Sequence, residues 1–358
     1  MSPIKFGIVG AGWRTEFYLR LARALPERFE VTGVVVRNAA KAPAFQARWD
    51  VKTFGALDEL LKTSSPAFVV VSAKWTDNHA VVADLWQRRV PALCETPPAP
   101  DVAGLVRLHA LMEQGAKVQV AEQYHLQPAH AARLALVRAG LLGTVSQAQV
   151  SVAHGFHGIS LIRRFLNAGF AAPTIEARRF ISPLIAGPDR SGPPTAQRIA
   201  DSEQGFLRLD FGDKLGIFDF TGDQYFSWIR GQRLLVRGER GEIVNHQVTY
   251  LKDFRTPIRL DLVRHEAGPD GNLEGKYLKG IQAGSEWVYT NPLAPAPLTD
   301  DEIAVGACLL GMDEYLRTGK SFYSLPEASQ DAYLSLMGER AMETGQPVKA
   351  ERMCWAQA

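Results

Sequence analysis

The feature that most constrains this chain is a glycine turn placed where a buried strand gives way to a helix. Ile4 to Val9 is a short apolar run, and it ends directly in Gly10-Ala11-Gly12. Apolar residues at helical spacing follow the turn. Glycine lets such a corner turn sharply and lets backbone N–H groups approach a diphosphate, while the helix N-terminus favours the anion. The corner therefore predicts a dinucleotide-binding βαβ unit.

Strand-like and helix-like segments alternate through the first third of the chain. After the glycine turn, strands are predicted at 31–36, near 51–54, and at 67–72, 90–94 and 117–120. The segments between them have helical patterns. Strands that alternate with helices indicate right-handed βαβ units and a doubly wound parallel sheet. We therefore expect an N-terminal Rossmann domain over residues 1–122.

The pattern changes near residue 123. Between 174 and 290 the chain predicts strand after strand, with polar and apolar residues alternating as in a sheet that has one solvated face. Two helices are expected near 300–318 and 326–343. Residues 183–200 are rich in Pro, Gly and Ser and are predicted to form a loop. Residues 123–358 therefore predict a C-terminal α+β domain with a large, mostly antiparallel sheet.

Composition and charge exclude some classes of binding partner and indicate the cellular compartment. The chain has 40 basic and 38 acidic side chains, so it lacks the basic excess typical of nucleic-acid or membrane-surface binding. No apolar run is long enough to predict a membrane span. The three cysteines, Cys94, Cys308 and Cys354, match neither a disulfide framework nor a metal-binding pattern. The first residues do not resemble a signal peptide. We therefore expect a cytoplasmic protein that binds neither nucleic acid nor membranes and holds no metal.

The end of the second strand bears on cofactor choice. Proteins that bind NAD usually carry an acidic side chain there, which binds the ribose 2′-hydroxyl. Here the strand ends in Val36-Arg37-Asn38. Arg37, assisted by Arg14 from the glycine turn, could instead pair with a 2′-phosphate, so NADP is expected in preference to NAD. The alternative is that Arg37 is an ordinary solvated arginine. The third glycine of the dinucleotide motif is replaced by Thr15.

Three segments together carry a family resemblance: the opening GIVGAGW, the tetrad Cys94-Glu95-Thr96-Pro97, and Ala153–Ser160 (AHGFHGIS). With them the chain resembles the Gfo/Idh/MocA oxidoreductases. The resemblance implies a cofactor lying across the first domain, and a sugar or polyol that is oxidised or reduced where the second sheet meets it. It also implies a homodimer or homotetramer assembled through the outer face of that sheet.

The glycine turn and the resemblance together predict the residues that bind the cofactor. His79 resembles the family's histidine facing the cofactor, and Trp75 is expected to cover the nicotinamide or the adenine. The full predicted set is Gly10, Gly12, Trp13, Arg14, Arg37, Asn38, Ser72, Trp75, His79, Glu95 and Thr96.

The catalytic positions depart from the family pattern. Thr96 stands where the resemblance implies a lysine, and a threonine neither carries charge nor titrates near neutrality. Ala153 stands where an aspartate is expected four residues before His157. Ser160 replaces a second aspartate, and Tyr124-His125 replaces an arginine after the sixth strand.

A histidine-rich site remains. His157 is the predicted acid–base group, since the reference pKa of imidazole, about 6.5, suits reversible proton transfer. Tyr124 and His125 are predicted to assist it, and His154 could converge on the same place. A zinc site built from these histidines matches no established spacing. The alternative for each histidine is a hydrogen-bonded structural role.

Three functions are consistent with these residues. The leading hypothesis is an NAD(P)-dependent oxidoreductase acting on a sugar, polyol or related carbohydrate, with the cofactor carrying the hydride. A second is a redox-neutral sugar enzyme that retains its cofactor. A third is a non-catalytic NAD(P)-binding protein, which the changes at Thr96 and Ala153 make a real alternative.

Overall fold

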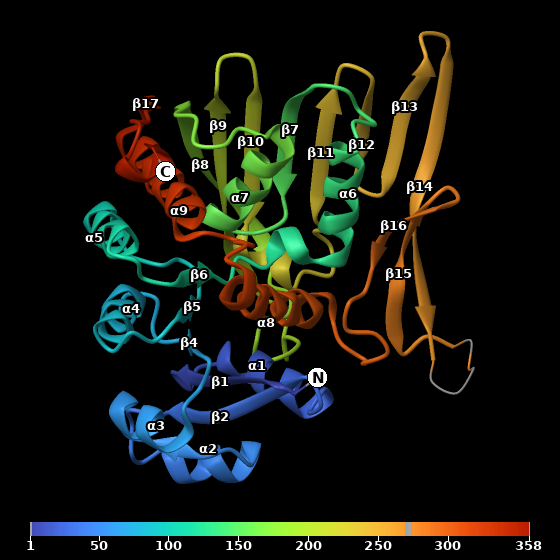
Figure 1. Ribbon diagram of the computed structural model, residues 1–358. Helices are drawn as coiled ribbons and strands as arrows, with labels where there is room; N and C mark the ends of the chain where they lie inside the picture. Colours follow the sequence, from blue (N-terminus) through green and yellow to red (C-terminus); the bar gives the residue numbers. More distant parts are fainter. Residues whose placement is uncertain (1, 269–271, 273, 358) are drawn as a thin grey trace.

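A computed structural model describes residues 2–268, 272 and 274–357, and their strands form two sheets (Figure 1). The first sheet has six strands in the order β3-β2-β1-β4-β5-β6, all of them parallel. Its strands are β1 (Ile4–Val9), β2 (Phe29–Val35), β3 (Thr53–Phe54), β4 (Phe68–Val71), β5 (Ala92–Cys94) and β6 (Val118–Val120). The direction of winding reverses between β1 and β4, where α/β sheets of this kind bind their ligands.

Helices pack on both faces of this sheet, so its central strands are uniformly apolar. All four residues of β4 are completely buried, as expected for a parallel strand covered on both faces. The helices of this region are α1 (Thr15–Ala24), α2 (Ala42–Trp49), α3 (Leu57–Ser64), α4 (Asn78–Gln87) and α5 (Val102–Glu113). Asp101 caps α5, because its carboxylate accepts a hydrogen bond from the backbone N–H of Gly104 at 2.7 Å.

The second sheet has eleven strands in the order β16-β15-β14-β13-β12-β11-β7-β10-β9-β8-β17. The β7–β10 pair is parallel, and the other pairs are antiparallel. The strands are β7 (Val145–Ser151), β8 (Thr174–Ile185), β9 (Ile199–Asp210), β10 (Leu215–Thr221), β11 (Arg233–Gly238), β12 (Gly241–Val244), β13 (Gln247–Asp253), β14 (Thr256–Ala267), β15 (Tyr277–Ala283), β16 (Glu286–Thr290) and β17 (Val348–Lys349).

Helices cover one face of the large sheet and tie it to the first domain. The helices α6 (Pro128–Arg138), α7 (Gly155–Leu166) and α9 (Leu325–Thr344) lie on one side of it (Figure 1). The helix α8 (Asp300–Thr318) returns to the first domain, where Cys308 and Met312 share a core with Phe6 and Leu21. The backbone N–H of Val120 in β6 donates to the carbonyl oxygen of Tyr323 at 3.0 Å, so the carboxyl end of β6 also lies against the second domain.

The predicted fold class is confirmed: a Rossmann sheet is followed by a large, mostly antiparallel sheet. The loop predicted at 183–200 is shorter than expected. Strand pairing continues to Ile185 opposite Ile199, which leaves only residues 186–198 outside the strands. Pro183 is compatible with a strand here because β17 pairs with β8 only at Thr174 and Ile175, so no ladder hydrogen bond is lost. In the described part of the chain, no helix is both long and apolar enough to cross a membrane.

Candidate active site

The glycine turn has the backbone geometry that a diphosphate site requires. Gly10 has φ +116°, and a Cβ on it would lie 2.0 Å from the carbonyl oxygen of Ser72, so no other residue fits there. A Cβ on Gly12 would meet no atom within 4 Å. The Thr15 hydroxyl donates to the carbonyl oxygen of Gly10 at 3.0 Å and contacts the Ser72 hydroxyl at 3.1 Å. Thr15 thus holds the turn against β4, in the position where the common motif has a third glycine.

A groove of about 550 Å³ continues from this turn along the carboxyl edge of the sheet. Val9, Arg37, Asp77 and His79 are among the residues that line it. The Nδ1 atom of His79 is buried there without a hydrogen-bond partner among the described residues. Arg37 is exposed, and its guanidinium pairs with the Asp77 carboxylate at 3.1 Å.

These features fit a nicotinamide dinucleotide. The open space over Gly12 leaves its backbone free for a diphosphate, and the N-terminus of α1 follows directly. The groove beyond has the position expected of an adenosine site in this topology. Trp13 and Trp75 follow the two central strands and are about half exposed, at 52% and 50%. Asn38 instead stabilises its own loop, because its side-chain oxygen accepts from the N–H of Ala40.

Arg14 and Glu95 do not face the groove as the sequence predicted. The Arg14 guanidinium pairs with Glu95 at 3.2 Å and with Asp301 of α8 at 2.8 Å. The Tyr18 hydroxyl also donates to the Glu95 carboxylate. Both predicted cofactor ligands are thus occupied by a buried ion-pair network, which joins α8 to the first domain. Of the two predicted arginines, only Arg37 is exposed in the groove.

The centre of the candidate active site is a buried carboxylate–imidazole pair. Glu122 follows β6, and its carboxylate lies 2.6 Å from Nδ1 of His157, in the first turns of α7. Both side chains are almost completely buried, at 1% and 8% exposure. A carboxylate that holds Nδ1–H orients the imidazole and leaves Nε2 as the working nitrogen. Nε2 makes no hydrogen bond to any described residue.

A second group of polar side chains lies against this pair. The Tyr124 ring contacts the His157 ring, with 4.5 Å between centroids, and His154 lies 4.9 Å from His157. The Tyr225 hydroxyl lies 2.6 Å from Nδ1 of His154 and accepts from the His154 backbone N–H at 3.0 Å. His154 and Tyr225 reach the surface, while Tyr124 and His157 are buried behind them. The cluster is therefore open on the side of His154 and closed on the side of Glu122.

Burial dominates the titration of the site. It raises the pKa of the Glu122 carboxyl to about 8 and lowers the pKa of the His157 imidazole to about 3. Because the two groups share a hydrogen bond, they titrate as a pair. Between these values the pair holds two protons and is neutral overall. Above about pH 8 it loses one proton, and the Glu122 carboxylate then accepts from Nδ1–H while Nε2 carries a lone pair. The reference pKa of a free imidazole, on which the sequence argument rested, does not apply to His157.

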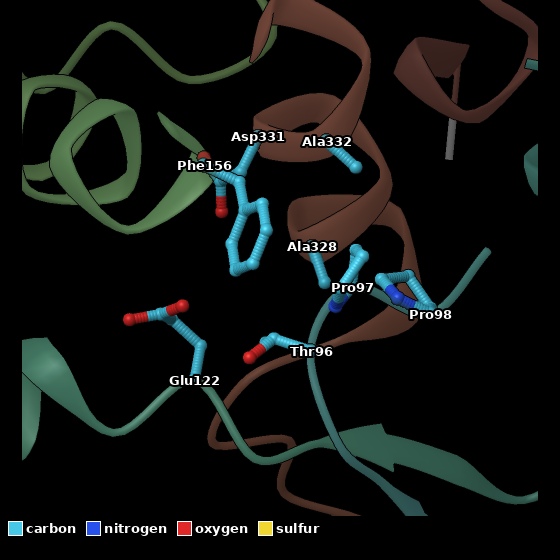
Figure 2. Close-up of a pocket in the computed structure, with 8 residues that line it drawn as sticks. All are labelled: Thr96, Pro97, Pro98, Glu122, Phe156, Ala328, Asp331 and Ala332. Atoms are coloured by element: carbon cyan, nitrogen blue, oxygen red, sulfur yellow. The ribbon is translucent and has the colours of Figure 1, made fainter. Parts of the chain in front are cut away.

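Thr96 lies beside the pair but supplies no charge. Figure 2 shows the Thr96 hydroxyl, the Glu122 carboxylate and the Phe156 ring around one small void beneath α9. The void is too narrow to admit a water molecule. The position where the family resemblance implies a lysine is thus next to Glu122. Among the described residues, the only ionisable groups that line this void are Glu122 and Asp331.

Other sequence candidates lie apart from the cluster. His125 is buried against Tyr323, with 4.9 Å between ring centroids, and burial lowers its pKa well below the usual range. Its ring is therefore not brought to His157, unlike that of its neighbour Tyr124. Within residues 2–268, 272 and 274–357, no group of three or more His, Cys, Asp or Glu side chains could hold a metal ion.

Sequence reasoning missed Glu122, Tyr225 and Asp301. Glu122 carried a usable signal, since an acidic residue directly after a buried parallel strand lies at the carboxyl edge of the sheet. Tyr225 comes from a short 3-10 helix, η2 (Gly222–Tyr225), and Asp301 from the start of α8. No local pattern connects either of them with residue 157.

Known proteins share this site region and this fold. Residues 4–124 match the family model described as the oxidoreductase family with an NAD-binding Rossmann fold. An uncharacterised oxidoreductase of Schizosaccharomyces pombe is 34% identical over 103 residues, which are 28% of this chain and 28% of that protein. The chain thus matches little more than a quarter of that curated relative.

Solved structures match along nearly the whole chain. An oxidoreductase from Agrobacterium radiobacter, in complex with NAD+, L-tartaric acid and magnesium, has a TM-score of 0.67 at 14% identity, with 97% of this chain and 98% of that chain covered. A myo-inositol dehydrogenase from Corynebacterium glutamicum has a TM-score of 0.63 at 14% identity, covering 98% and 100%. The WlbA dehydrogenase from Bordetella pertussis, in complex with NADH and UDP-GlcNAcA, has a TM-score of 0.63 at 15% identity, covering 98% and 99%. These similarities show a shared fold.

The six-stranded sheet and its glycine turn are those of an NAD-binding Rossmann fold of the oxidoreductase kind. The resemblance inferred from the sequence is confirmed over residues 4–124, which match the model of the Gfo/Idh/MocA oxidoreductases.

Proposed function

We propose that this protein is an NAD(P)-dependent oxidoreductase that acts on a sugar, a polyol or a related carbohydrate. The observation that carries the proposal is the Glu122–His157 pair, joined at 2.6 Å at the carboxyl edge of the dinucleotide-binding sheet. Two of the similar structures support the substrate class, since one is a myo-inositol dehydrogenase and the other holds UDP-GlcNAcA.

In this proposal the bound nicotinamide supplies the hydride acceptor or donor. Gly10 and Gly12 would offer backbone N–H groups to the diphosphate, and the half-exposed rings of Trp13 and Trp75 would be available to contact the cofactor. Arg37, at the far end of the groove, would bind a 2′-phosphate and favour NADP over NAD. That preference would require Arg37 to exchange the Asp77 carboxylate for the phosphate.

His157 handles the substrate's proton. In the direction of oxidation, Nε2 accepts the hydroxyl proton as the hydride departs, and the Glu122 carboxylate stabilises the imidazolium that forms. In the direction of reduction, the same proton returns to the new alkoxide. The Tyr124 and Tyr225 hydroxyls, which lie beside His154 and His157, would orient the substrate. In this proposal the Glu122 carboxylate and the His157 imidazole thus transfer the substrate's proton, a role for which the family resemblance implies a lysine and an aspartate.

The test is a panel of sugars, polyols and sugar acids, offered with NAD+ and NADP+ while absorbance of the reduced nicotinamide is followed. Turnover is expected with at least one compound, and His157→Ala should lower it by about 10²-fold to 10⁴-fold without weakening cofactor binding. His246→Ala, in the exposed turn between β12 and β13, is the matched control and should have no effect. Full turnover by His157→Ala would contradict the proposal.

A non-catalytic cofactor-binding protein is the alternative that the residues at 96 and 153 favour. It predicts tight cofactor binding and no turnover on any member of the panel. A redox-neutral sugar enzyme would instead purify with its nucleotide bound and would convert a sugar without added NAD(P).

Assembly as a homodimer or homotetramer is part of the proposal. Strand alternation places six large, exposed apolar side chains on the face of the sheet that α6, α7 and α9 leave uncovered. They are Phe180, Phe206, Val244, Leu251, Val263 and Trp287. Burial of such a face would favour self-association, and light scattering coupled to gel filtration measures the mass. A reducing, cytoplasmic setting is proposed on the ground that all three cysteines are free.

A further inference from the structure

The loop between β8 and β9 reaches from the large sheet to the glycine turn of the first domain (Figure 1). The two strands pair as far as Ile185 and Ile199, and the chain between them carries Arg190. The Arg190 guanidinium lies over the Trp13 ring, with its Cζ 4.1 Å from the centroid. Trp13 directly follows Gly12, so this contact joins the hairpin to the diphosphate turn.

Hydrogen bonds within the loop order its tip. The N–H of Asp189 donates to the carbonyl of Gly192, and the N–H of Gly192 donates back to the carbonyl of Asp189, both at 3.1 Å. The Asp189 carboxylate accepts from the N–H of Ser191 at 2.7 Å. The nearest acidic neighbour of Arg190 in the sequence is thus engaged elsewhere. Arg190 itself makes no ion pair with any residue that the structure describes, and its side chain is exposed.

The same guanidinium also lies near the proposed catalytic cluster. Burial is the main cause that lowers the pKa of His154, and the neighbouring His157 is the second. The positive charge of Arg190 lowers this pKa further. The His154 ring lies on the open side of the cluster, with 4.9 Å between its centroid and that of the His157 ring. By contrast, the Arg14 guanidinium is neutralised by Glu95 and Asp301. Within the described part of the chain, Arg190 is therefore an unpaired cation between the diphosphate turn and the proposed proton-handling histidines.

An arginine in this state is suited to bind an anion. Stacking on an aromatic ring holds the guanidinium plane by one face and leaves its N–H edge free for two parallel hydrogen bonds to a carboxylate or phosphate. The ordered tip lowers the entropy that such binding would cost.

We propose that Arg190 binds an anionic group of the substrate, and that the substrate class is an acidic carbohydrate such as a uronate or an aldonate. This inference rests on the proposed function, because it takes the His157 cluster as the place of reaction. The diphosphate of the cofactor is the other anion within the same region, and the experiment distinguishes the two sources.

The experiment measures binding by calorimetry on the NADH-loaded protein. Each acid is paired with a neutral compound that lacks only the carboxylate: D-galacturonate with D-galactose, and D-gluconate with D-glucitol. We expect at least one acid to bind about tenfold tighter than its neutral partner. Arg190→Gln should abolish that preference, Arg190→Lys should restore part of it, and the affinity for NADH should stay unchanged. Arg198→Gln removes the same charge from the same loop and is the matched control.

Three binding results would overturn the inference. The first is equal binding of acids and neutral partners, and the second is failure of every acid to bind at millimolar concentration. The third is a loss of NADH affinity in Arg190→Gln with no change for the acids, which would assign the side chain to the diphosphate. Because the readout is binding, Arg190-dependent binding of an acid without hydride transfer would refute only the proposed oxidoreductase activity. Hydride transfer that depends on His157 but not on Arg190 would refute only this inference.

Discussion

The part of the candidate site that would bind the cofactor and the part that would transfer the proton differ in where their residues come from in the sequence. The cofactor half consists of Gly10, Gly12 and Thr15, which are neighbours in the sequence and act largely through backbone geometry. The proton-handling half joins Glu122 after β6 to His157 in α7, with Tyr225 from η2 beside them. The first half keeps the common motif except for one position. The second half departs from the family pattern at residues 96 and 153.

The difference shows which kind of site tolerates substitution. A diphosphate turn needs one particular backbone conformation. No residue other than glycine fits at position 10, because a Cβ there would overlap the Ser72 carbonyl. A proton-handling site needs only an ionisable group at the right place, and this can come from any element that reaches it. Glu122 reaches His157 from the strand next to the one that carries Thr96.

Gly10→Ala should damage both the fold and cofactor binding, whereas Gly12→Ala should damage binding alone. A methyl group at position 10 would require the Ser72 backbone to move and would add strain of about 1–3 kcal/mol at a positive φ. A methyl group at position 12 has open space and would intrude only on the bound diphosphate. Thermal unfolding and fluorescence titration with NADPH measure the two effects. Equal melting temperatures for the two variants would contradict the different roles assigned to Gly10 and Gly12.

Glu122→Gln should lower turnover by about 10²-fold and remove a pH dependence. In the wild-type protein, oxidation should rise with pH through about 8, because the pair must lose one proton before Nε2 can accept another. Reduction should fall through the same range, since it needs the protonated pair. Glutamine cannot ionise, so the transition should disappear from pH–rate profiles. Glu343→Gln, exposed at the end of α9, should leave the profile intact. Persistence of the transition in Glu122→Gln would assign it to another group.

Arg37→Gln should weaken NADP+ binding by about tenfold and leave NAD+ binding unchanged, because only the 2′-phosphate would lose a charge-assisted pair. Arg107→Gln, on the exposed face of α5, serves as control. Titrations that show tighter binding of NAD+ than of NADP+ by the wild-type protein would refute the proposed preference.

Thr96→Lys should change turnover by less than about tenfold, since Glu122 and His157 already supply the proton path. The ammonium would approach the Glu122 carboxylate and lower its pKa, so the transition near pH 8 should move to lower pH. The void beside Thr96 has no room for the longer side chain, so Phe156 must shift and the melting temperature should fall. Activity that appears only in Thr96→Lys would show that the natural protein is not a dehydrogenase.

Much of the fold was readable from local patterns, and much of the proposed catalytic site was not. The strands β1 and β4 and the helices α8 and α9 lie where the sequence predicts them. The loop at 183–200 was predicted too long, because composition does not reveal cross-strand pairing at Ile185 and Ile199. The position of Arg14 directly after the glycine turn predicts a contact with the cofactor. In the structure its guanidinium pairs with Glu95 and with Asp301, and Asp301 is 287 residues away in the chain.

The parallel sheet and its glycine corner can be predicted from local sequence, because they depend on backbone geometry and on apolar periodicity within short segments. Which ionisable groups come into contact depends instead on how distant segments pack in three dimensions. Glu122 and His157 are 35 residues apart, and no sequence motif connects the two positions. Their contact and their burial arise only when β6 and α7 pack together. The pKa of Glu122 then lies above that of His157, the reverse of the usual order, because a charge is perturbed by its neighbours in space and not by those in sequence.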